Sequence, residues 1–82
     1  MLYLTYYIFR HIIMKNLSQF LKEKRKENNL TQEEFSERAG IALTVVRKIE
    51  QGKENLNLEK VNQALKMFGH ILAPVSEKDL SK

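Results

Sequence analysis

Two short helix signals separated by a single glycine constrain the fold of this chain more than any other feature of its sequence. Thr31 and Glu34 have the T-x-x-E spacing of a capping box, in which a hydroxyl and a carboxylate each satisfy a backbone N–H group. A helix is therefore expected from about Gln32, and Gly40 supplies the left-handed residue that ends it. Because only two residues follow before the next apolar pattern, the chain must turn sharply there into another helix.

The helix after this turn is expected over residues 43–51, and Gly52 ends it. Apolar residues three to four positions apart share one side of a helix, which indicates the buried side of each. The inward side chains expected in the two helices are Phe35, Ala39, Val46 and Ile49.

Two further helices are expected to flank this pair. An amphipathic helix begins at about Leu17 and stops at residues 28–29, two asparagines that tolerate left-handed backbone. Asn57 caps a fourth helix, which Gly69 ends. Its inward stripe is expected to hold Leu58, Val61, Leu65 and Phe68. The fold class is accordingly all-α, with a four-helix domain over residues 15–69.

The C-terminal residues differ from this helical part. Residues 70–75, HILAPV, are short, apolar and β-leaning, and Pro74 restricts them to a sheet edge or a strand end. A short C-terminal β-strand is therefore expected there. The polar residues 76–82 are expected to form a flexible tail.

The N-terminal residues 1–14 are apolar and aromatic. They are too few for a membrane span, which needs about 20 apolar residues, and they lack the basic start and cleavage site of a signal peptide. Three interpretations stay open for this extension: a strand or helix packed on the domain, a disordered tail, or a start codon assigned upstream of a true start at Met14. We favour the last, because the helical domain begins just after Met14.

Composition excludes several kinds of chemistry. The chain has no cysteine, which excludes disulfides, thiolate zinc sites and cysteine nucleophiles, and favours a reducing, cytoplasmic setting. His11 and His70 lie far apart without carboxylates at ligand spacing, so no metal site is expected. We find no pattern of a nucleophile with a base and no phosphate-binding glycine loop, and therefore expect neither catalysis nor a cofactor. The net charge of +4 suits a polyanionic partner, although many soluble domains carry a similar excess.

The helix pair resembles the lambda-repressor-like (XRE) helix-turn-helix family. The matching residues are 30–35, 39–41 and 46–53, and the resemblance covers residues 17–68. It implies a DNA-binding domain whose second motif helix enters the major groove. It also implies an ion pair between Arg25 and Glu50 that joins the first and third helices.

The physics of such a motif assigns candidate roles to single residues. A helix N-terminus favours phosphate, so Gln32 is expected to contact a DNA phosphate, as the resemblance also implies. Lys53, just past the third helix, is expected to contact another phosphate. The outward side chains of the third helix are expected to face base edges. Which of Arg47 and Lys48 reads bases stays open, and Ala42 at the cap position leaves that helix without a side-chain cap. The full candidate DNA-binding set is Thr31, Gln32, Ala42, Leu43, Thr44, Arg47, Lys48, Gln51 and Lys53.

The C-terminal half resembles HipB-type antitoxins in residues 56–58, 61–65 and 68–69, followed by one terminal strand. This resemblance implies a homodimeric repressor that pairs through that strand, binds operator DNA, neutralises a HipA-like kinase toxin and represses their shared operon. The expected dimer contacts are Ile71, Leu72 and Ala73. The alternatives are a phage-type or housekeeping repressor without a toxin partner, and a protein-interaction module.

Overall fold

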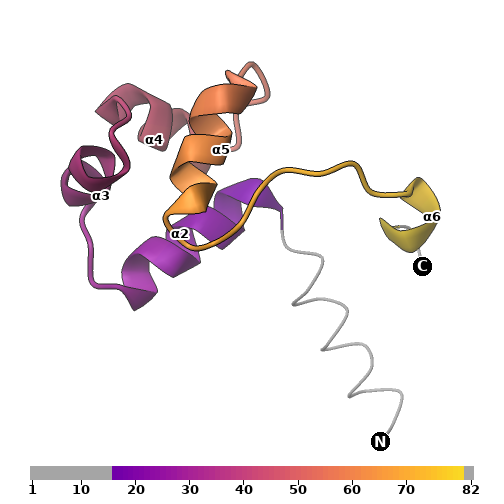
Figure 1. The fold of residues 1–82 in the computed structure, drawn as a ribbon, viewed down its shortest axis with the longest axis horizontal. Coiled ribbons are helices and arrows are strands. Elements are labelled where there is room, and N and C mark those ends of the chain that lie inside the picture. The colour runs from indigo at the N-terminus through magenta and orange to yellow at the C-terminus, as the bar shows by residue number, and fades with distance from the viewer. Residues whose placement is uncertain (1–15, 81–82) are drawn as a thin grey trace, which may run out of the picture.

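The computed structural model describes residues 16–80, in which four helices joined by turns and loops are followed by an extended segment and a short last helix (Figure 1). The expectations for residues 1–14 lie outside the described residues. The helices are α2 (Leu17–Glu27), α3 (Gln32–Ala39), α4 (Leu43–Glu50), α5 (Leu58–Lys66) and the one-turn α6 (Glu77–Leu80). The predicted order of four helices is therefore confirmed.

Local hydrogen bonds at the helix ends explain these bounds. The capping box of α3 is complete: Glu34 N donates to Thr31 Oγ1 at 3.0 Å, and Thr31 N donates to Glu34 Oε1 at 2.9 Å. Gly40 ends α3 in the left-handed region with φ +71°. The Asn57 side chain caps α5 by accepting from Lys60 N at 3.1 Å.

The core lies where α2, α3, α4 and α5 meet. Its largest fully buried side chains are Phe35, Leu21, Ile49, Val46 and Val61. Phe68, just after α5, stacks on Phe35 with ring centroids 5.5 Å apart. The predicted inward residues are thus confirmed for α3 and α4.

One predicted core residue is wrong. Leu58, the first residue of α5, is 68% exposed. The inward side of α5 begins one turn later and holds Val61, Ala64 and Leu65. Leu56, which precedes the cap, packs against the core at this end of the helix instead.

Residues 70–75 do not form the expected strand in the described chain. A strand needs a second backbone to pair with, and no part of residues 16–80 supplies one. The segment is held to α5 by two hydrogen bonds, from His70 N to Leu65 O at 3.0 Å and from Leu72 N to Asn62 Oδ1 at 2.8 Å. Beyond these contacts it runs away from α3 and α4 toward α6 (Figure 1). The flexibility of residues 76–82 stays a prediction.

Candidate nucleic-acid interface

A side chain of α5 holds the turn between α3 and α4 by hydrogen bonds. The Nε2 atom of Gln63 donates to Ala39 O at 2.9 Å and to Gly40 O at 3.0 Å. Gly40 has a positive φ and also little room for a side chain, because a Cβ atom there would lie 3.1 Å from Gln63 Nε2. The angle between the two motif helices is therefore supported by a residue outside the motif. Gln63 was not expected from the sequence, since no periodic pattern links a residue of the fourth helix to this turn.

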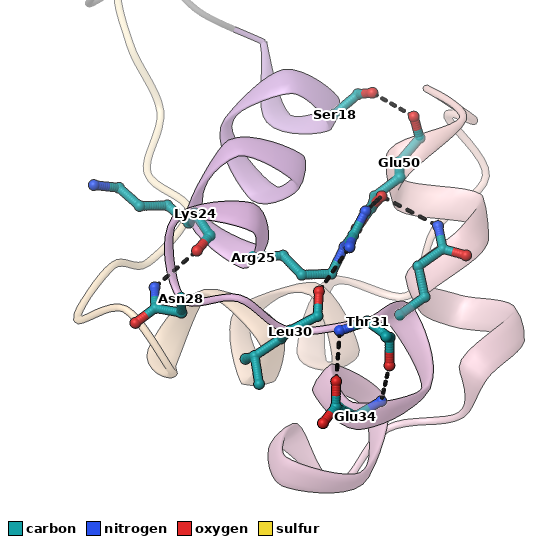
Figure 2. Close-up of polar contacts among 9 residues, drawn as sticks. Ser18, Lys24, Arg25, Asn28, Leu30, Thr31, Glu34 and Glu50 are labelled. Atoms are coloured by element: carbon teal, nitrogen blue, oxygen red, sulfur yellow. Dashed lines mark hydrogen bonds and ion pairs between the residues drawn. The ribbon is translucent and has the colours of Figure 1, made fainter.

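A buried ion pair joins α2 to the end of α4, as the family resemblance implied. Arg25 Nε donates to Glu50 Oε2 at 2.8 Å, and Arg25 Nη2 donates to Oε1 at 3.0 Å. The same guanidinium donates through Nη1 to Leu30 O at 2.8 Å, just before the cap of α3 (Figure 2). At the other end of the network, Ser18 Oγ donates to Glu50 O at 2.6 Å. Arg25 thus fixes both the end of α4 and the chain entering α3.

The ion pair shifts the pKa of both groups. Burial raises the pKa of the Glu50 carboxyl, but hydrogen bonds from Arg25 and Gln32 outweigh burial and hold it below its ordinary value. The hydrogen bond to Glu50 raises the pKa of Arg25. Both groups are therefore charged at neutral pH, and the charges compensate each other.

The start of α3 is exposed and rich in donors. Thr31 and Glu33 are exposed, and Gln32 is half-buried. In residues 16–80, the backbone N–H groups of Gln32 and Glu33 have no acceptor, because they precede the first intrahelical hydrogen bond. At the same end, the backbone N–H of Thr31 lowers the pKa of Glu34. Two backbone donors and the positive end of the helix dipole are thus available to an anion.

Gln32 is more constrained than the sequence indicated. Its Nε2 atom donates to Glu50 Oε1 at 3.1 Å, so the side chain is held against the end of α4. The two residues are 18 positions apart, and no sequence pattern relates them.

The outward side of α4 carries the exposed polar side chains of Thr44, Arg47 and Lys48, and the exposed C-cap Gln51 follows them. Leu43 is half-buried. Arg47 has a partner that was not expected: its Nη2 atom lies 3.5 Å from Glu33 Oε1. With side-chain exposures of 49% and 60%, this ion pair is weak and can open when a stronger anion approaches.

The remaining candidates flank α4. Ala42 is exposed and occupies the cap position without a side-chain hydrogen bond, as predicted. Lys53 is exposed, and its backbone N–H donates to Lys48 O at 3.1 Å, which folds the chain back toward α4. The phosphate candidates thus lie at the start of α3 and just after α4, while the base-reading candidates lie along α4 and at its C-cap.

The predicted dimer contacts lie elsewhere, on the segment after α5. Ile71 is 73% exposed and Leu72 is 37% exposed. With Ala73 they border a cavity of about 550 Å³ whose other apolar walls are Leu17, Phe20 and Leu65. An apolar surface thus lies apart from the motif helices.

Residues 16–80 contain no group of three or more His, Asp or Glu side chains that could hold a metal ion. No helix in this part of the chain is long and apolar enough to cross a membrane.

The chain matches a known protein family. A family model described as helix-turn-helix matches residues 21–71, more than half of the chain. No curated protein and no solved structure matches the chain significantly.

Proposed function

This chain belongs to the lambda-repressor-like (XRE) helix-turn-helix family, a family of DNA-binding regulators, and we propose that it is a repressor that reads operator DNA with α4. The observation that carries this proposal is the placement of Thr44, Arg47 and Lys48 together on the exposed side of α4, with Gln51 at its C-cap. Such side chains donate to base edges and to phosphates in the major groove.

The start of α3 supports the same binding mode. Its free backbone donors favour a phosphate, and a phosphate contact beside α4 would set the register of that helix in the groove. Lys53 adds a positive charge after α4. In this arrangement Gln32 and Lys53 contact phosphates, while the outward side chains of α4 contact bases.

The decisive experiment is selection of binding sequences from a random duplex pool by the full chain, followed by titration of the selected duplex. We expect a defined motif to be enriched, and affinity to fall steeply between about 50 and 200 mM salt. A protein-interaction module would enrich no motif and show no such salt dependence. That result would overturn the proposal.

A homodimer is part of this proposal. One motif helix reads only a few base pairs, and two half-sites about one helical turn apart supply useful specificity. The exposed apolar residues Ile71 and Leu72 support a second copy of the chain as the partner. Pairing between copies would also supply the second backbone that residues 70–75 lack.

The finer proposal is an antitoxin role, in which the repressor neutralises a HipA-like kinase and controls their operon. It is supported by the resemblance of residues 56–69 to HipB-type antitoxins. Co-purification of the chain with the product of the adjacent gene tests it. A kinase-like neighbour that is bound and inhibited supports the antitoxin, whereas a neighbour of another class that does not bind favours a phage-type or housekeeping repressor.

A further inference from the structure

The carboxylate of Glu50 determines how the amide of Gln32 is oriented. An ionised carboxylate only accepts hydrogen bonds, so Gln32 must turn its NH₂ group, and not its oxygen, toward Glu50. The contact measures 3.1 Å to the oxygen that also accepts from Arg25. Glu50 stays ionised near neutral pH, since its pKa lies below the ordinary value.

This orientation leaves one side-chain donor. The NH₂ group of Gln32 has two hydrogens, and Glu50 accepts one of them. The second remains on a half-buried side chain at the start of α3, next to the unpaired backbone N–H groups of Gln32 and Glu33. A rotated amide would instead place its oxygen where this NH₂ group lies, and an oxygen cannot donate to a phosphate.

We propose that Glu50 is a positioning residue for DNA binding: by accepting one hydrogen of the Gln32 amide, it directs the other toward a DNA phosphate. This inference rests on the proposed contact between Gln32 and phosphate. A carboxylate close to a phosphate would normally repel it, but the Arg25 guanidinium compensates the charge of Glu50. The buried ion pair is therefore also a support for the anion site.

The test is a scan of the selected operator duplex in which each phosphate is replaced, one at a time, by an uncharged methylphosphonate. For the unmodified chain we expect one phosphate in each half-site whose replacement weakens binding about tenfold through loss of the Gln32 contact. In Gln32→Leu, the loss at that phosphate should fall below about threefold, because only the backbone N–H groups remain to contact it. In Glu50→Leu, which leaves no acceptor for the Gln32 amide, the loss at that phosphate should shrink below about threefold, while losses at other phosphates stay unchanged.

A matched control is Glu37→Leu, which removes an exposed carboxylate of α3 outside the network. It should keep the full loss at the Gln32-dependent phosphate. If Glu50→Leu does not fold, the double variant Arg25→Met with Glu50→Leu removes both charges of the ion pair together and should show the same reduced loss.

Each outcome is decisive. A full loss at that phosphate in Glu50→Leu or in the double variant would overturn the positioning role while leaving DNA binding intact. A scan in which no phosphate depends on Gln32 would also overturn the positioning role. Failure of the unmodified chain to bind any duplex would instead overturn the proposed function.

Discussion

Arg25 and Glu50 form a two-point ion pair, at 2.8 and 3.0 Å, with side-chain exposures of only 11% and 3%. Removing one partner leaves the other buried without a compensating charge. We expect Arg25→Ala to lower the free energy of unfolding by about 3 kcal/mol, measured by urea denaturation. The matched control is Lys24→Ala, which breaks the exposed pair with Glu27 at 3.4 Å and should cost less than about 1 kcal/mol. Equal losses would contradict a structural role for the buried pair.

The stability of the fold should depend on acid pH. Glu50 has a pKa below its ordinary value because hydrogen bonds from Arg25 and Gln32 outweigh the opposing effect of burial, and the backbone N–H of Thr31 lowers the pKa of Glu34. A carboxyl with a lower pKa in the folded chain contributes stability above its unfolded pKa of about 4.3, and this is lost as the pH falls through the folded-state pKa.

We therefore expect urea unfolding to show constant stability near neutral pH and a loss below about pH 4.3. Glu50→Gln should be less stable at neutral pH but lose less on acidification. Glu34→Gln can keep the capping hydrogen bond. It should remove only the part of the stability loss at acid pH that comes from protonation of Glu34. Acid profiles identical to that of the unmodified chain in both variants would refute this assignment.

The sequence predicts best what short-range chemistry determines. The capping box of Thr31 and Glu34, the left-handed Gly40 and the inward positions of α3 and α4 depend on neighbouring residues, and all are confirmed. Leu58 fits the same periodicity but lies in the first turn of α5, where Leu56 packs against the core instead. Periodicity alone does not show where the packed part of a helix begins.

The contacts that organise the candidate site join residues far apart in the sequence, and no local sequence pattern predicts them. Gln63 reaches the turn at Gly40 from another helix, and Gln32 meets Glu50 across the motif. The pair of Arg25 and Glu50 was anticipated only from the family resemblance. The strand expected over residues 70–75 depends on a pairing partner, which the apolar composition of a segment does not specify.

Gly40 and Gly69 allow a direct test of the role of Gln63. Both glycines have positive φ, +71° and +73°, but only at Gly40 would a Cβ meet another group, Gln63 Nε2 at 3.1 Å. Gly69→Ala should cost about 1–2 kcal/mol of unfolding free energy for its backbone alone. Gly40→Ala should cost more unfolding free energy. The double variant Gly40→Ala with Gln63→Ala should cost less than the sum of the two single variants, because removing Gln63 also removes the crowding. Equal costs for the two glycine variants would argue against crowding at the turn.

Arg47 and Lys48 are both exposed on α4, so their replacement should affect DNA binding and not folding. We expect Arg47→Ala or Lys48→Ala to weaken binding to the selected operator by about tenfold, with the thermal midpoint nearly unchanged. Lys66→Ala removes the same charge from the exposed side of α5 and is the control. Normal binding by both α4 variants would refute the placement of the reading helix.

Glu33→Gln should act in the opposite direction to the α4 variants. It removes a negative charge from the start of α3 and releases Arg47 from a contact of 3.5 Å. Operator affinity in a fluorescence titration should therefore rise by about twofold to fivefold, with the larger gain at low salt. A fall in affinity would show that the ion pair positions Arg47 for binding instead of restraining it.

Ile71 and Leu58 are similarly exposed, at 73% and 68%, but Leu58 is the first residue of α5, whereas Ile71 lies beyond its C-terminal end. If residues 70–75 join two copies of the chain, Ile71→Asp should raise the monomer fraction in sedimentation velocity, because a carboxylate would be buried in the interface. Leu58→Asp introduces the same charge outside the proposed interface and should leave the dimer intact. Truncation after Gly69 should also give monomers, although it removes the hydrogen bond from Leu72 N to Asn62 as well. A dimer that survives both Ile71→Asp and the truncation would exclude this segment as the main interface.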